Sequence, residues 1–124
     1  MNYQAQNFSG LFRASFAPDL WQYLRRPETV LAMEVATKLR KPAVEAIGDD
    51  LIRDFGTVVQ QKRVKQMVGH MVRQIMESRG YILDAQRVPC RFDKLFSSGT
   101  RYKRDPQLAQ TRFSKPGWAA WGTS

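Results

Sequence analysis

Cysteine and histidine are nearly absent from the sequence, which has Cys90 and His70 as its single examples in 124 residues. One cysteine cannot form an intramolecular disulfide, and one cysteine with one histidine cannot supply the four ligands of a structural zinc site. No apolar run approaches the ~20 residues of a membrane-spanning helix. The first 15 residues also lack the pattern of a secretory signal. We therefore expect a cytoplasmic protein that binds no membrane, metal or cofactor.

Recognisable catalytic motifs are missing as well. The chain has no Gly-x-Ser-x-Gly, no phosphate-binding Gly-Lys-Ser/Thr and no His-Glu-x-x-His. Its densest acidic group consists of Glu45, Asp49, Asp50 and Asp54. Carboxylates along one helix, with Arg53 among them, are typical of a solvated face and not of converging metal ligands. We expect no enzymatic activity.

The single histidine and the single cysteine have ordinary interpretations. His70 falls beside an apolar stripe, where a partly buried, hydrogen-bonded histidine is expected in preference to a catalytic base. Cys90 is expected to be an ordinary thiol, although the neighbouring Arg91 favours a lower pKa for it.

The positive charge is confined to the second half of the chain. Residues 1–60 contain seven basic and seven acidic residues, whereas residues 61–124 contain thirteen basic and four acidic ones. The later residues therefore carry the whole formal net charge of +9. Such an asymmetry favours a polyanionic partner, and nucleic acid first. The alternative is a basic face that is merely solvated, because net charge governs association and not fold.

The length of the chain fits a single domain. We expect an N-terminal arm over residues 1–18, a helical domain with a C-terminal hairpin over 19–104, and a basic, aromatic tail over 105–124. Within the domain, Pro27 and Pro42 suit first helical turns, and Gly56 and Gly80 suit positions just beyond helix ends. The helices are expected at about 27–40, 42–55 and 58–79.

Helical spacing predicts which faces are buried. In helix 27–40 the apolar set is Val30, Leu31, Val35 and Leu39, with Met33 outside it. Helix 58–79 has the strongest periodic signal in the chain, a wide apolar stripe over about four turns. Its members are Val64, Met67, Val68, Met71, Val72, Ile75 and Met76. This stripe indicates a core, and it is also wide enough for a dimer seam.

The periodicity changes after Gly80. Tyr81-Ile82-Leu83 is β-prone, Pro89 is typical of an edge strand, and Ser97-Ser98-Gly99 indicates a turn. We expect two or three short strands that form a hairpin over residues 81–104. The predicted fold is α+β and mostly helical, with a three-helix core followed by a short β-hairpin.

This order of elements resembles the winged helix-turn-helix class of DNA-binding domains over about residues 27–104. The resemblance implies that helix 58–79 is the recognition helix, whose first turns contact base edges and phosphates. The helix positions concerned are Gln60, Gln61, Lys62, Lys65, Gln66 and Arg73. The hairpin would be the wing, contacting phosphates through Arg87, Arg91, Lys94, Arg101, Lys103 and Arg104.

Two further interpretations remain open. RNA or single-stranded nucleic acid could stack on the aromatic tail, which contains Arg112, Phe113, Lys115, Trp118 and Trp121. Alternatively, the protein is a homodimeric interaction module, since interfaces are enriched in aromatic residues. The N-terminal Phe8, Phe12 and Phe16 would then pack on their own domain or cross to a second subunit.

Overall fold

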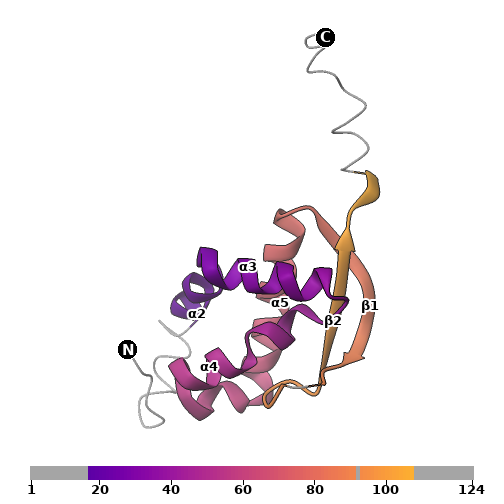
Figure 1. The fold of residues 1–124 in the computed structure, drawn as a ribbon. Helices are drawn as coiled ribbons and strands as arrows, with labels where there is room; N and C mark the ends of the chain where they lie inside the picture. Colours follow the sequence, from indigo (N-terminus) through magenta and orange to yellow (C-terminus); the bar gives the residue numbers. More distant parts are fainter. Residues whose placement is uncertain (1–16, 92, 108–124) are drawn as a thin grey trace.

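The computed structural model describes residues 17–91 and 93–107. A set of helices is followed by one antiparallel hairpin along their side (Figure 1), which confirms the predicted α+β fold with a helical core. The predicted tail from residue 108 and the N-terminal phenylalanines lie outside the described residues. The helices and 3₁₀ turns are α2 (Ala17–Leu24), α3 (Pro27–Lys38), η3 (Ala43–Ala46), α4 (Gly48–Phe55), η4 (Gly56–Gln60) and α5 (Lys62–Ser78).

The helix boundaries refine the sequence prediction. The helix α2 is a fourth helix that the predicted three-helix core did not include, and Ala17 and Pro18, which the sequence assigned to the arm, belong to it. The expected helix 42–55 is broken at Ile47, between the 3₁₀ turn η3 and α4. The expected helix 58–79 begins as the 3₁₀ turn η4 and becomes α-helical at Lys62. Gly56 has a φ of 79° and ends α4, as its position suggested.

Helix α5 provides the centre of the core. Val64, Val68, Val72 and Met76 follow one another at four-residue steps and are fully buried or nearly so. They pack in one cluster with Leu20 and other buried side chains of α2, α3 and α4. The predicted stripe of this helix is therefore confirmed as core. Met67 and Met71 lie half-buried at its margin.

The predicted buried face of α3 is wrong. Leu31, Val35 and Leu39 are 61 %, 47 % and 59 % exposed, whereas Met33 has no exposed surface. The buried face of α3 combines apolar and small polar residues, namely Thr29, Val30, Met33, Ala36 and Thr37. The hydroxyl of Thr37 donates to the carbonyl of Met33 at 2.9 Å, so burial leaves that hydroxyl hydrogen-bonded.

The hairpin consists of β1 (Tyr81–Pro89) and β2 (Ser98–Arg104), as the change of period after Gly80 predicted. Their ladder has irregularities between Leu83 and Ala85 and between Ala85 and Val88. The first half of β2 packs on η3, because a Cβ on Gly99 would lie 2.5 Å from a methyl group of Val44. The buried Tyr102 holds the second half of β2 on the core.

Candidate nucleic-acid interface

The first turns of α5 present polar and basic side chains to solvent. Gln61, Lys62 and Gln66 are exposed and Lys65 is half-exposed. Among the described residues, no carboxylate pairs with either lysine. Arg63 also belongs to this exposed face, and the sequence analysis did not single it out. Its place opposite Val64 and Val68 on a helical wheel could have found it.

A shallow groove of about 120 Å³ separates α5 from the start of β2. Lys65 and Gly69 line it from α5, and Ser98, Gly99 and Thr100 line it from β2. Its floor is made of Val44, Val72, Phe96 and Tyr102. The groove therefore brings the predicted recognition helix and the predicted wing side by side.

Two cations of the hairpin and one from the end of α3 surround a single carboxylate. Asp84 on β1 pairs with Arg101 at 2.8 Å, with Arg40 at 3.4 Å and with Lys103 at 4.0 Å. The hydrogen bond from Arg101 is the main reason why the pKa of Asp84 is lowered, and the other two cations act in the same direction. Three positive charges around one negative charge leave an excess of two at the end of α3.

The cluster includes one cation that the sequence did not predict. Arg40 lies just beyond α3 with a positive φ of 66°, a conformation that favours glycine at this position. Its charge reaches Asp84 because the end of α3 lies against β2. No sequence spacing connects these two residues, so this partner required the folded chain.

The other basic residues that the sequence predicted to contact nucleic acid lie apart from the Asp84 cluster. Arg73 pairs with Glu77 at 3.1 Å on the surface of α5. Arg104 stacks over the ring of Tyr81 at 4.7 Å and donates to the carbonyl of Arg79. The other three wing cations, Arg87, Arg91 and Lys94, are exposed.

His70 differs from the sequence prediction, whereas Cys90 agrees with the expectation of an ordinary thiol. His70 is exposed, since it lies on the face of α5 opposite Val68 and Val72. Burial, with help from Asp93 and Glu45, raises the pKa of Cys90 to about 12. The neighbouring Arg91 therefore does not determine the pKa of the Cys90 thiol.

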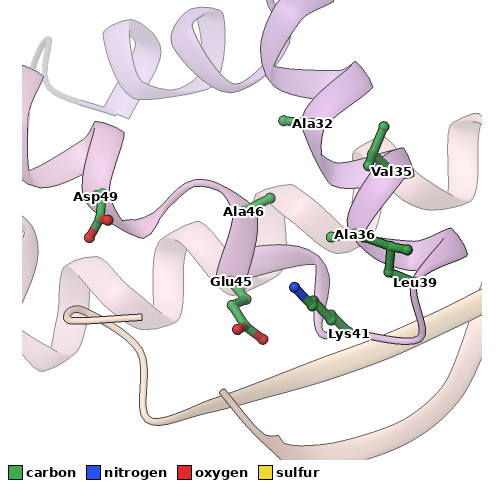
Figure 2. A pocket seen from close by; sticks show the side chains of 8 residues that line it. All are labelled: Ala32, Val35, Ala36, Leu39, Lys41, Glu45, Ala46 and Asp49. Carbon is green, nitrogen blue, oxygen red and sulfur yellow. The ribbon is translucent and has the colours of Figure 1, made fainter. Parts of the chain in front are cut away.

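A second surface lies between α3 and η3, beside the buried face of α3. Figure 2 shows Ala32, Val35, Ala36 and Leu39 along one wall of a groove, facing Ala46. The groove has a volume of about 340 Å³, and its polar edge consists of Lys41, Glu45 and Asp49. An apolar groove with a charged edge is typical of a contact surface for another protein.

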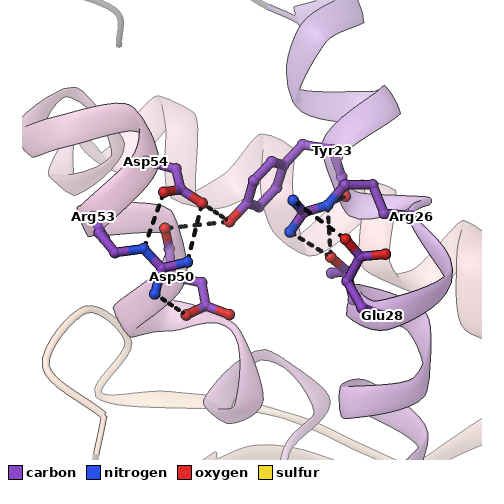
Figure 3. Close-up of polar contacts among 7 residues, drawn as sticks. Tyr23, Arg26, Glu28, Asp50, Arg53 and Asp54 are labelled. Atoms are coloured by element: carbon purple, nitrogen blue, oxygen red, sulfur yellow. Dashed lines mark hydrogen bonds and ion pairs between the residues drawn. The ribbon is translucent and has the colours of Figure 1, made fainter. Parts of the chain in front are cut away.

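Tyr23 joins α2 to α4. Its hydroxyl donates to the carboxylate of Asp54, while the guanidinium of Arg26 lies 3.7 Å from the centre of its ring (Figure 3). Arg53 binds the same carboxylate from the solvent side and also pairs with Asp50 at 3.0 Å. Two members of the acidic group, Asp50 and Asp54, thus have a structural role on α4, while Glu45 lies on η3.

Among the described residues, no helix has both the length and the apolarity needed to cross a lipid bilayer. Comparison with known protein families, curated proteins and solved structures finds no match.

Proposed function

We propose that this protein binds duplex DNA through the first turns of α5 and the basic hairpin, in a regulatory or accessory role in the cytoplasm and without catalysis. One observation carries the proposal: the chain's whole net charge lies in the half that forms α5 and the hairpin. Lys62 and Lys65 are accessible and unpaired among the described residues, as phosphate contacts require.

The order of the elements supports the same proposal. After α2 and α3, the 3₁₀ turn η3, α4, the 3₁₀ turn η4 and α5 lead to the hairpin, and this order of helices followed by a hairpin resembles the winged helix-turn-helix class. The stretch after α3 leads to Pro42 and Val44, which pack against Gly99 at the start of β2. The hairpin is thereby held beside α5, with the groove between them open to a ligand.

The test is fluorescence anisotropy with labelled duplex DNA, duplex RNA and single strands over a salt series. We expect duplex DNA to bind best, with an affinity that falls as salt rises, by a slope of about 0.9 per phosphate contact. Preference for single strands that is lost on deletion of residues 106–124 would favour the aromatic tail instead. The absence of any binding at low salt would refute a nucleic-acid role.

Two double variants that lose the same charge show, by comparison of their DNA affinities, whether α5 forms the binding surface. Lys62→Ala with Lys65→Ala removes two cations from α5, and we expect it to weaken binding and reduce the salt slope by about two. Arg25→Ala with Lys38→Ala removes two exposed cations, one just after α2 and one on α3, and serves as the control. Equal losses in the two variants would show that only net charge matters.

The exposed side of α3 favours a second candidate function, a homodimer. Leu31, Val35 and Leu39 share one face at four-residue steps. In an antiparallel pair centred on Val35, Leu31 of one copy would meet Leu39 of the second. Glu28 at one end of α3 would then lie near Lys38 and Lys41 of the second copy, so the charges of the two ends are complementary.

Sedimentation at two protein concentrations tests the dimer. Val35→Glu places two like charges at the symmetry axis, and we expect it to convert a dimer to a monomer. Gln74→Glu adds the same charge at an exposed position of α5 and should leave the dimer intact. A parent protein that sediments as a monomer at both concentrations would refute this candidate.

A further inference from the structure

Among the described glycines, Gly69 is the one whose position requires glycine neither for lack of space nor for a positive φ angle. A Cβ on Gly48 or Gly99 would collide with Asp93 or Val44, and Gly56 and Gly80 have positive φ angles. Gly69 has neither property: it lies in the middle of α5, and a Cβ there would meet nothing within 4 Å. Glycine weakens a helix interior relative to alanine, so this position lowers the stability of α5 with no internal compensation.

The surroundings of Gly69 are rich in groups that bind phosphate. Lys65 lies one turn before it on the same side of α5 and lines the groove, whereas Arg73, one turn after it, is paired with Glu77. Across the groove are Ser98 and Thr100, whose hydroxyl groups can donate hydrogen bonds. No acidic residue lines the groove. These ammonium and hydroxyl donors lie at the rim above the apolar floor, and they suit a phosphodiester better than a cationic ligand.

We infer that the groove between α5 and β2 seats the sugar-phosphate backbone of the nucleic acid at Gly69. The missing side chain leaves room for the phosphate beside α5, whose interior N–H groups are hydrogen-bonded within the helix, while Lys65 and Thr100 contact its oxygens from opposite walls. The inference rests on the proposed function and assigns this groove to backbone positioning, not to base reading. The hairpin and α5 would thereby contact the backbone of the same nucleic-acid strand.

Two substitutions at Gly69 separate binding from folding. We expect Gly69→Ala to raise the melting temperature by about 3–8 °C, because alanine favours the helix and the new methyl group has open space. The same variant should bind duplex DNA more weakly than the parent. Gly69→Leu fills more of the groove and should weaken binding further, by about tenfold or more, with a salt slope reduced by about one.

Gln74→Leu is the matched control, because it puts the same side chain on an exposed position of α5 outside the groove. The loss at Gly69 should be the same for duplexes of different sequence, since phosphate contacts do not read bases.

Each outcome has a distinct meaning. If the parent protein binds no duplex DNA, the proposed function fails and this inference fails with it. If the parent binds and both Gly69 variants keep its affinity and salt slope, the groove is not the backbone site, while the proposed function stands. Should Gly69→Leu fail to fold, Gly69→Ala decides between the last two results.

Discussion

Adding one methyl group at Gly99 should destabilise the fold. The new Cβ would lie 2.5 Å from a Val44 methyl and 3.1 Å from Pro42 Cβ, where carbon atoms prefer ~3.5–4.0 Å. Neither neighbour can move easily, because Val44 is buried and β-branched and the ring of Pro42 is rigid. Overpacking of this kind costs about 1–3 kcal/mol, which corresponds to a fall of ~5–20 °C in melting temperature.

The assay is thermal and urea unfolding of Gly99→Ala followed by circular dichroism, with Gly69→Ala as its counterpart. The same chemical change should lower stability at position 99 and raise it at position 69, since only the first Cβ meets an obstacle. Val44→Ala in the Gly99→Ala background makes room for the new methyl group, so the two changes should cost less together than separately. A Gly99→Ala protein within ~0.5 kcal/mol of the parent would refute the argument that β2 packs rigidly on η3.

Three further outcomes follow from the polar groups. Because the pKa of Asp84 is lowered by Arg101, its contribution to stability is fully present above about pH 4 and is lost as pH falls through its folded pKa. Asp84→Asn should therefore be less stable than the parent at pH 7 in urea unfolding, and the difference should shrink as the pH is lowered through that folded pKa; a difference that does not change with pH would refute the ion pair's contribution. Tyr23→Phe removes a hydrogen bond to Asp54 and should cost about 1 kcal/mol, measured by the same unfolding; an unchanged midpoint would show that the bond contributes nothing. With a pKa of about 12, Cys90 should react slowly with a disulfide reagent at pH 8 in the folded protein and rapidly in denaturant; rapid labelling of the folded protein would contradict its burial.

The sequence predicted the order of the elements because their signals are local. Gly56 and Gly80 mark helix ends, and the period of the apolar residues changes where β1 begins. The face of α3 could not be chosen in the same way. Its exposed set and its buried set both have helical spacing, and the exposed set contains the larger apolar residues. Only the packing of α3 against its neighbours shows that Met33 points inward.

The candidate site was predictable as a list of cations but not as an arrangement. Charge counting identifies Lys62 and Lys65 as accessible basic residues, and the structure places them on the exposed side of α5. Charge counting does not show that Arg101 and Lys103 both pair with Asp84, or that Arg40 pairs with the same carboxylate. These contacts connect residues 17 to 44 positions apart, and such pairs depend on the tertiary fold.

The irregular hydrogen-bonded ladder of the hairpin also limits the pairing of further strands with the edges of the sheet. A two-stranded sheet has two open edges, and each presents backbone groups to any passing strand. The η3 turn and the end of α3 contact β2. On β1, two bulges, the positive φ of Arg87 and the missing N–H of Pro89 interrupt the row of donors and acceptors. The hairpin can therefore display its cations in solution without templating an intermolecular sheet, so self-association through strand pairing and growth into fibres is disfavoured.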